Sequence, residues 1–226
     1  MNVNDFSIVV ASEAHTGYAE QICDEMAESA KARGTGIARR SPEYVANKMR
    51  EGKAVIALHN DGTWAGFCYI ETWSHEQFVA NSGLIVNPAF RKAGLAKAIK
   101  KRIFELSREK YPNAKIFGLT TGLAVMKINS ELGYEPVTYS ELTQDDNFWK
   151  GCQSCVNYEI LTMKGRKNCL CTAMLYDPVE KQKQEEEKAA AEKEQEMTHK
   201  ANLLERIEDS IKRSVKSIAF LSTLIP

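Results

Sequence analysis

The sequence has no excess of charge of either sign and no long apolar run. Its 226 residues include 30 Lys and Arg against 30 Asp and Glu, so the formal net charge is zero. A neutral chain has no overall field that would recruit nucleic acid or an anionic membrane. It also lacks an apolar stretch of about 18 residues, which would predict a transmembrane helix, and a basic segment leading into an apolar one at the N-terminus, which would predict a secretory signal. We therefore expect a cytoplasmic protein with neither nucleic acid nor a membrane among its partners.

The first 178 residues alternate between strand patterns and helix patterns. Short apolar runs bounded by turn residues predict strands, and apolar residues at helical spacing predict helices. Asn60-Asp61-Gly62 between two apolar runs predicts a β-hairpin. The predicted strands are 6–11, 54–59, 64–72, 78–86, 115–120 and 167–176, and the predicted helices are 15–33, one from 41 onward, 95–110 and 122–132. We therefore expect one folded domain over residues 1–178.

The stretch LIVNPAFRKAGLA, residues 84–96, turns from a strand pattern into a helix pattern through two cations, a glycine and an alanine. The unpaired N–H groups at a helix N-terminus attract anions. Gly94 lets the backbone approach a ligand closely, and Arg91, Lys92 and Lys97 add positive charge. These features predict a phosphate or pyrophosphate site, although the motifs G-x-x-x-x-G-K-[ST] and G-x-G-x-x-G are both absent.

This order of elements resembles the GCN5-related N-acetyltransferase (GNAT) superfamily. LIVNPAFRKAGLA is similar to its signature, in which a strand end leads into a Q/R-x-x-G-x-G/A loop, and ELGYEPV, residues 131–137, resembles its final motif. The resemblance covers about residues 6–176. It implies an α+β GNAT fold with a mixed, mostly antiparallel central sheet and helices on both faces, to which this chain adds a C-terminal helical tail.

The resemblance also implies an acyl-coenzyme A, either acetyl-CoA or succinyl-CoA, as co-substrate. Loop amides would hold its pyrophosphate, and its pantetheine arm would lie where strand 84–86 splays from strand 115–120. An amine would attack the thioester directly, so we expect no cysteine nucleophile. The implied cofactor-binding residues are Leu84, Ile85, Val86, Arg91, Lys92, Ala93, Gly94, Leu95, Ala96 and Lys97.

Four residues are candidates for the proton transfers that such a reaction needs. Glu71, at a strand end, is the candidate base, with His75 next; a solvated carboxylate is the alternative. The family often has a Tyr acid where this chain has Asn129, which could still donate a hydrogen bond to the sulfur or to pantetheine. Tyr134 is either a substitute acid or a core residue.

The segment KARGTGIARR carries Arg33, Arg39 and Arg40 around a Gly-Thr-Gly turn. In the family this loop often shapes the acceptor site, and Arg binds carboxylates through paired hydrogen bonds. With Thr120 and Thr121, these residues are expected to bind a small acidic amino acid, most simply glutamate. Together with KAGLAKAIK and FWKGC, the segment resembles bacterial single-domain, N-acetylglutamate-synthase-like acyltransferases of arginine biosynthesis. A solvated basic loop is the alternative, with the two threonines capping a helix.

Two other functions stay open at this point. The fold could hold acyl-CoA as a sensor, or it could acetylate protein lysines. An Arg-lined acceptor site disfavours the second, because it would repel a basic peptide.

Four of the six cysteines form two close pairs, Cys152-x2-Cys155 and Cys169-x-Cys171. In a reducing cytoplasm such pairs predict structural Zn²⁺ in a four-cysteine site. This subsite would span 152–171, with the first pair on a turn and the second on a strand. Buried thiols acting as small hydrophobic side chains are the alternative.

The composition changes after residue 178. Residues 179–202 are mostly Glu, Lys, Ala and Gln, which predicts a solvated helix or a disordered linker. Residues 203–226 carry an apolar stripe from Leu204 to Leu221 at helical spacing, which predicts an amphipathic helix. Such a stripe could pair with its own copy, dock on the folded domain or bind another partner, so a homo-oligomer is one of the arrangements that the sequence allows.

Overall fold

The computed structural model describes residues 2–34 and 38–222, with side chains as far as residue 200 and at residue 203. The chain forms two compact units, Met1–Pro178 and Val179–Pro226. The first is a domain of strands and helices, and the second is the greater part of one long helix.

Seven strands and seven α-helices make up the described chain. The strands are β1 (Phe6–Val10), β2 (Ala54–His59), β3 (Trp64–Trp73), β4 (Phe78–Val86), β5 (Lys115–Thr120), β6 (Glu135–Val137) and β7 (Thr172–Tyr176). The helices are α1 (Ala19–Arg33), α2 (Pro42–Arg50), α3 (Leu95–Lys110), α4 (Leu123–Glu131), α5 (Asp146–Lys150), α6 (Tyr158–Met163) and α7 (Pro178–Ser222).

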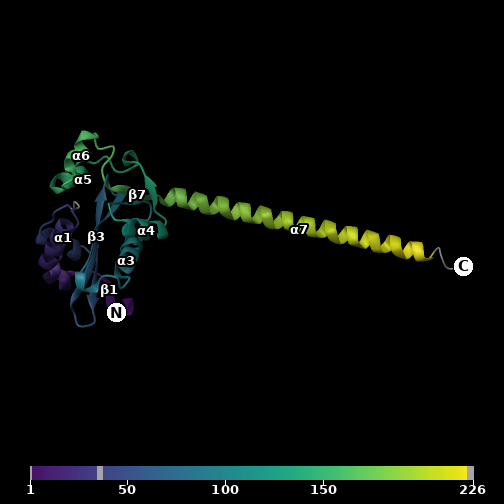
Figure 1. Cartoon of the computed structure of the whole chain (residues 1–226), viewed down its shortest axis with the longest axis horizontal. Coiled ribbons are helices and arrows are strands. Elements are labelled where there is room, and N and C mark those ends of the chain that lie inside the picture. The colour runs from purple at the N-terminus through teal and green to yellow at the C-terminus, as the bar shows by residue number, and fades with distance from the viewer. Residues whose placement is uncertain (1, 35–37, 223–226) are drawn as a thin grey trace. The chain divides into compact units, whose positions relative to one another are not determined.

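All seven strands join one sheet in the order β1-β2-β3-β4-β5-β7-β6. Only the β4–β5 pair is parallel among the described pairs, and the other neighbours are antiparallel. Figure 1 shows α1 on one side of the sheet and α3 with α4 on the other. The predicted α+β fold, with a mixed and mostly antiparallel sheet between helices, is confirmed.

Three apolar clusters pack against this sheet, and two of them lie on opposite faces of β3. Successive residues of β3 enter opposite cores, because side chains alternate along a strand. Cys68 joins the core under α3, and Tyr69 joins the core under α1 and α2. The α3 residues buried in the first core are Leu95, Ile99, Ile103 and Leu106, at helical spacing.

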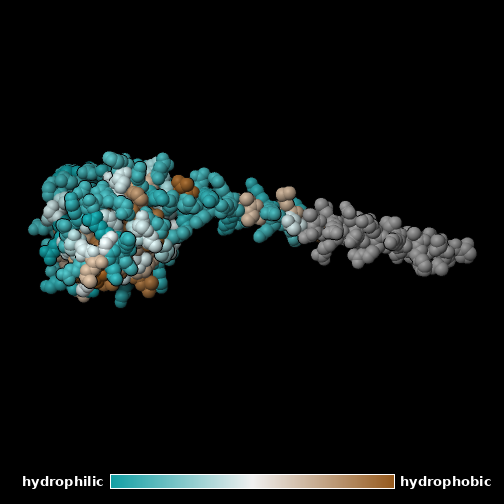
Figure 2. Space-filling model, turned by 90° about the horizontal axis from the view of Figure 1, so that it is seen from above, coloured by the Kyte–Doolittle hydropathy of each residue, from teal (hydrophilic) through white to brown (hydrophobic). Residues whose placement is uncertain are grey.

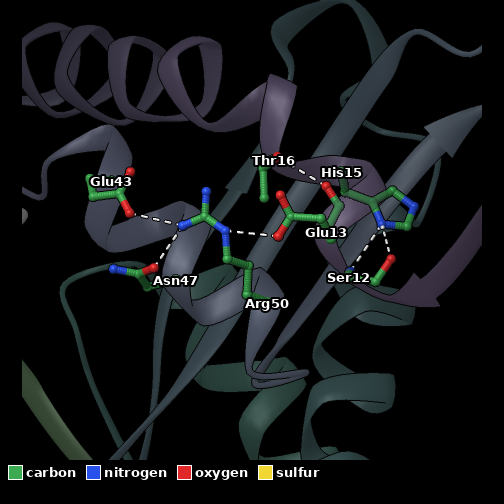
Figure 3. Close-up of polar contacts among 7 residues, drawn as sticks. All are labelled: Ser12, Glu13, His15, Thr16, Glu43, Asn47 and Arg50. Carbon is green, nitrogen blue, oxygen red and sulfur yellow. Dashed lines mark hydrogen bonds and ion pairs between the residues drawn. The ribbon is translucent and has the colours of Figure 1, made fainter.

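A polar network at the surface joins α2 to the short 3-10 helix Glu13–Tyr18 that precedes α1. Arg50 donates to Glu13 at 2.8 Å, to Glu43 at 2.8 Å and to Asn47 at 2.7 Å (Figure 3). Both carboxylates are exposed, so each ion pair contributes at most about 1 kcal/mol. The network therefore sets the position of α2 more than it stabilises the domain.

Two predicted boundaries are wrong. The strand predicted over 167–176 begins only at Thr172, so Cys169 and Cys171 precede β7 instead of lying on it. The helix predicted over 15–33 begins as the 3-10 helix Glu13–Tyr18 and becomes α-helical at Ala19. In this first turn the His15 ring accepts a hydrogen bond from the Ser12 amide at 3.0 Å, which fixes a tight capping turn.

The helix α7 is continuous through 179–202 and into the segment that follows. Its described side chains are almost all exposed, and Figure 2 shows this part as largely hydrophilic. Pairs at i,i+4 spacing, such as Lys183 with Glu187 and Lys188 with Glu192, support a polar helix. The side chains of the predicted stripe from Leu204 to Leu221 lie outside the described residues. Among the described helices, none is long and apolar enough to cross a bilayer.

Candidate active site

The strands β4 and β5 pair over only three residues and then separate. Phe78 pairs with Lys115, and the described register ends at Ala80 opposite Phe117. Beyond this point β4 stays with β3 and β5 stays with β7. Residues 81–86 and 118–120 therefore border an opening in the sheet, which we call the notch.

A β-bulge distorts β4 along the notch. The β3–β4 register passes from Phe67 opposite Ile85 to Tyr69 opposite Ser82. Two residues of β4, Gly83 and Leu84, therefore face the single residue Cys68 of β3. Gly83 has a φ of +66°, which a glycine adopts without strain. Bulges of this kind re-aim backbone groups next to functional sites.

At the far end of β4, residues 91–94 form the turn into α3. We call this turn and the first helical residues, 91–97 in all, the α3 loop. Lys92 and Gly94 have φ values of +68° and +78°, and α3 begins at Leu95. Gly94 is the N-cap and has no side chain with which to cap the first-turn amides. These N–H groups, at the start of a 16-residue helix, are suited to an anion.

The cations of the α3 loop differ in their contacts. Arg91 donates to Glu25 at 3.0 Å and to Ser29 at 2.7 Å, so its side chain fastens the loop to α1. Lys97 pairs with Glu131 of α4 at 2.7 Å, and Lys92 is exposed. Sequence reasoning placed Arg91 on a ligand and had no signal for its pairing with α1.

The predicted base and a predicted acceptor residue meet in one buried cluster. Arg40 contacts Glu71 Oε1 at 3.1 Å and donates to the Tyr69 hydroxyl at 3.0 Å. Tyr44 donates to the same Oε1, and Ser82 donates to Oε2 at 2.8 Å. The side chains of Glu71 and Arg40 are only 5% and 17% exposed. The carboxylate is therefore held by three donors, and its role as the base stays a prediction.

The hydroxyls of this cluster remain protonated. Burial, and then the charge of Glu71, raises the pKa of both Tyr44 and Tyr69 above the ordinary value. Both tyrosines can therefore donate hydrogen bonds across the neutral pH range. Sequence reasoning missed Tyr44, Tyr69 and Ser82. The two-residue spacing of Tyr69 and Glu71, which puts them on one face of β3, was the available signal.

The other predicted acceptor residues are not gathered into this cluster. Arg39 is exposed, and its backbone N–H donates to Ser154 at 3.0 Å. Arg33 is exposed at the end of α1, and residues 35–37 between these arginines lie outside the described residues. Thr120 accepts a hydrogen bond from the Gly122 amide at 3.0 Å, just before α4, and Thr121 is exposed. The N-cap of α4 is Gly122, so neither threonine caps this helix.

Asn129 and Tyr134 lie beneath the notch. Asn129 is 1% exposed and donates to the Met174 sulfur at 3.8 Å, and its Oδ1 has no partner among the described residues. Tyr134 is 2% exposed and donates to Asn81 Oδ1 at 3.0 Å. Burial raises the pKa of Tyr134 well above its usual value. Tyr134 is thus a core residue whose hydroxyl reaches the first β4 residue of the notch.

The four paired cysteines do come together, around a cavity of about 30 Å³. In the described chain, however, no three His, Cys, Asp or Glu side chains are arranged to hold a metal ion. The zinc prediction is therefore not supported. Cys169 and Cys171 stand in an irregular segment before β7, not on the strand that was expected.

Two of these thiols, Cys152 and Cys171, are protonated near neutral pH. Burial, together with the neighbouring cysteines, raises the pKa of Cys152 to about 11 and that of Cys171 to about 12. This is the behaviour of thiols that serve as small hydrophobic side chains.

Alkaline pH is expected to destabilise the domain through these two thiols. Because their pKa is raised above 9.0 in the folded state, the unfolded chain loses their protons first. Their contribution to stability is full below that value and is lost as the pH rises to about 11 and 12. We expect the Tm to fall more steeply between pH 8 and pH 11 than it does for a Cys152→Ala/Cys171→Ala variant. Parallel melting curves over that range would contradict this account.

No family model and no curated protein sequence matches this chain. Solved structures do match it. N-acetylglutamate synthase from Neisseria gonorrhoeae, bound to coenzyme A and N-acetyl-glutamate, is 19% identical with a TM-score of 0.55, over 76% of this chain and 35% of that chain. The present chain thus spans about a third of that synthase.

Two further structures extend this likeness over nearly whole chains. The Mycobacterium tuberculosis protein Rv2747, in complex with CoA and NLQ, is 16% identical with a TM-score of 0.53, over 76% of this chain and 98% of that chain. A GNAT superfamily phosphinothricin acetyltransferase from Sinorhizobium meliloti, in complex with AcCoA, is 14% identical with a TM-score of 0.51, over 76% and 88%. The sheet order, the notch and these likenesses together show that the chain has the fold of the GNAT acetyltransferases.

Proposed function

We propose that this protein is an acyl-CoA-dependent N-acyltransferase whose acceptor is a small acidic amino acid, glutamate in the simplest case. The observation that carries the proposal is the notch, which leaves residues 81–86 of β4 without β5 and leads to the uncapped start of α3. A pantetheine arm can pair with such a strand edge, and first-turn amides can bind a pyrophosphate. Structures with this fold contain coenzyme A or acetyl-CoA.

The acceptor lies, in this proposal, on the α1–α2 side of the notch. Glu71, Arg40, Tyr44 and Ser82 are concentrated there. Arg40 is engaged by Glu71 and Tyr69, whereas the guanidinium of Arg39 is exposed. Arg39 is therefore the side chain that we assign to the acceptor carboxylate, with Arg40 held rigidly behind it.

The reaction is tested by release of free thiol from acetyl-CoA and, in parallel, from succinyl-CoA, with a panel of free amino acids. We expect release that depends on glutamate or a close acidic analogue. If coenzyme A binds by calorimetry but none of the amino acids supports release, the proposed acceptor is wrong.

Replacing Arg39 by Ala should weaken the binding of the acceptor alone. A charge-assisted hydrogen bond contributes about 1.5–3 kcal/mol, so we expect the KM for glutamate to rise by roughly 10-fold to 100-fold. The Kd for coenzyme A should not change. The matched control is Lys31→Ala, which removes an exposed cation of α1. It should leave the KM for glutamate and the Kd for coenzyme A unchanged. An unaltered KM in Arg39→Ala would place the carboxylate elsewhere.

A further inference from the structure

Lys100 is a buried lysine without an acidic partner among the described side chains. It lies on the second turn of α3 and is 2% exposed. Its ammonium lies 5.3 Å from the centre of the Tyr134 ring, and Cys68 is the titratable group that acts on it electrostatically. Burying an ammonium without a carboxylate is unfavourable, so the position calls for a role other than stability.

Two hydrogen bonds connect the surroundings of Lys100 to the notch. Cys68 donates to the Ser82 carbonyl at 3.3 Å, and Tyr134 donates to Asn81 Oδ1 at 3.0 Å. Asn81 and Ser82 are the first two residues of β4 after its last pairing with β5. Lys100 is therefore a neighbour of both side chains that support the inner end of the notch, on the α3 side of the sheet.

The other polar groups at this end of the notch are poor proton donors. Asn129 is an amide, and its Nδ2 is directed at the Met174 sulfur. The Tyr134 hydroxyl is already bonded to Asn81, and burial raises its pKa well above the usual value. A thiolate that leaves at this end of the notch would need a different donor.

We propose that Lys100 is the proton donor to the leaving thiolate, an inference that rests on the acyl transfer proposed above. The acceptor nitrogen attacks the thioester carbon, the new C–N bond forms, and the C–S bond breaks with its electron pair on sulfur. The Lys100 ammonium gives its proton to that sulfur and yields the free thiol. The acceptor nitrogen loses its proton to solvent. The neutral amine of Lys100 then takes up a proton from solvent, so the balance of protons is restored.

The environment of Lys100 suits this role. Burial lowers the pKa of Lys100 below its ordinary 10.5 and so towards that of a thiol, which favours proton transfer between them. The titratable side chains that face it are Cys68 from β3 and Tyr134 from the segment after α4. Burial raises the pKa of Cys68 to about 11, so both neighbours are uncharged at neutral pH.

The test compares Lys100→Met with Lys101→Met, which removes the next lysine of α3, an exposed one paired with Glu105. We expect Lys100→Met to lower kcat for acetyl-CoA and glutamate by about 100-fold or more. It should keep the Kd for coenzyme A within threefold. It should also raise the Tm by about 3 °C or more, because an unpaired buried charge is replaced by an apolar side chain. Lys101→Met should behave like the wild type in all three measurements.

Two further readouts separate proton donation from simple charge or packing. The wild-type kcat should fall as the pH rises through the lowered pKa of Lys100, because the acid form is lost, and this limb should be absent in Lys100→Met. Lys100→Arg keeps the positive charge, but arginine cannot give up its proton. Its kcat should therefore be as low as that of Lys100→Met.

Three results would overturn the inference. One is a kcat of Lys100→Met within threefold of the wild type. Another is a slow variant that also melts earlier and no longer binds coenzyme A, which would make Lys100 structural. The third is full activity in Lys100→Arg. A wild-type protein that releases no thiol with any amine would refute the proposed function and this inference with it, whereas an active Lys100→Met refutes the inference alone.

Discussion

Glu71→Ala is expected to lower the free energy of unfolding by about 3–5 kcal/mol, the usual result of removing one partner of a buried ion pair. Glu71 is the shared acceptor for Arg40, Tyr44 and Ser82. Without it, a mostly buried guanidinium and two hydroxyls lose their acceptor together. Glutamate-dependent turnover should be lost as well, because Arg40 would no longer be held in place. Urea unfolding and the thiol-release assay measure the two effects.

Two other variants sharpen this prediction. Glu43→Ala removes an exposed carboxylate that also pairs with an arginine, and it should cost less than about 1 kcal/mol. Arg40→Met/Glu71→Met, which replaces the pair by apolar side chains, should recover much of the lost stability but no activity. If Glu71→Ala unfolds at the same urea concentration as the wild type, the cluster does not hold the domain together.

Gly83→Ala is expected to destabilise the domain by about 2–4 kcal/mol, from overpacking and left-handed backbone strain combined. A Cβ at this position would lie 2.3 Å from Tyr69 Cε1 and 2.8 Å from Met26 Cε. Met26 can bend away, but Tyr69 is 2% exposed and bonded to Arg40. Relief of the clash must therefore move the bulge or the Arg40 cluster, so we also expect turnover to fall by more than tenfold.

Gly165→Ala is the matched control for Gly83→Ala. Its φ of +57° imposes a similar backbone strain, but no described atom lies within 4 Å of the added Cβ. It should cost only about 1–2 kcal/mol and leave turnover unchanged. Equal losses in the two variants would show that the close contact with Tyr69 has no consequence for the bulge.

The local parts of this molecule could be predicted from the sequence. The turn from β4 into α3 is visible because a proline, two cations and a glycine are adjacent in the chain. The apolar stripe of α3 and the hairpin around Asn60-Asp61-Gly62 are likewise short-range patterns. These features were sufficient for a mixed, mostly antiparallel sheet, with strand 84–86 splayed from strand 115–120, to be expected from the GNAT resemblance.

The long-range contacts could not be predicted. Arg40 and Glu71 are 31 positions apart in the chain. Nothing in the sequence near either residue indicates that the two form an ion pair. Arg91 was expected to face a ligand because its charge was visible, whereas its pairing with Glu25 is a tertiary contact. Lys100 was overlooked because a lysine on a helix is normally solvated. The start of β7 was also missed, because this strand begins later than the apolar run indicated, so Cys169 and Cys171 precede it.

The central claim is that the α3 loop and the notch edge of β4 hold coenzyme A, and amide hydrogen exchange with and without coenzyme A tests it most directly. The account predicts slower exchange at residues 84–86 and 92–97 when coenzyme A is present. Residues around the cysteine cavity should exchange at the same rate in both states. Protection that is absent from these two segments while coenzyme A binds, or the lack of any binding, would contradict the account.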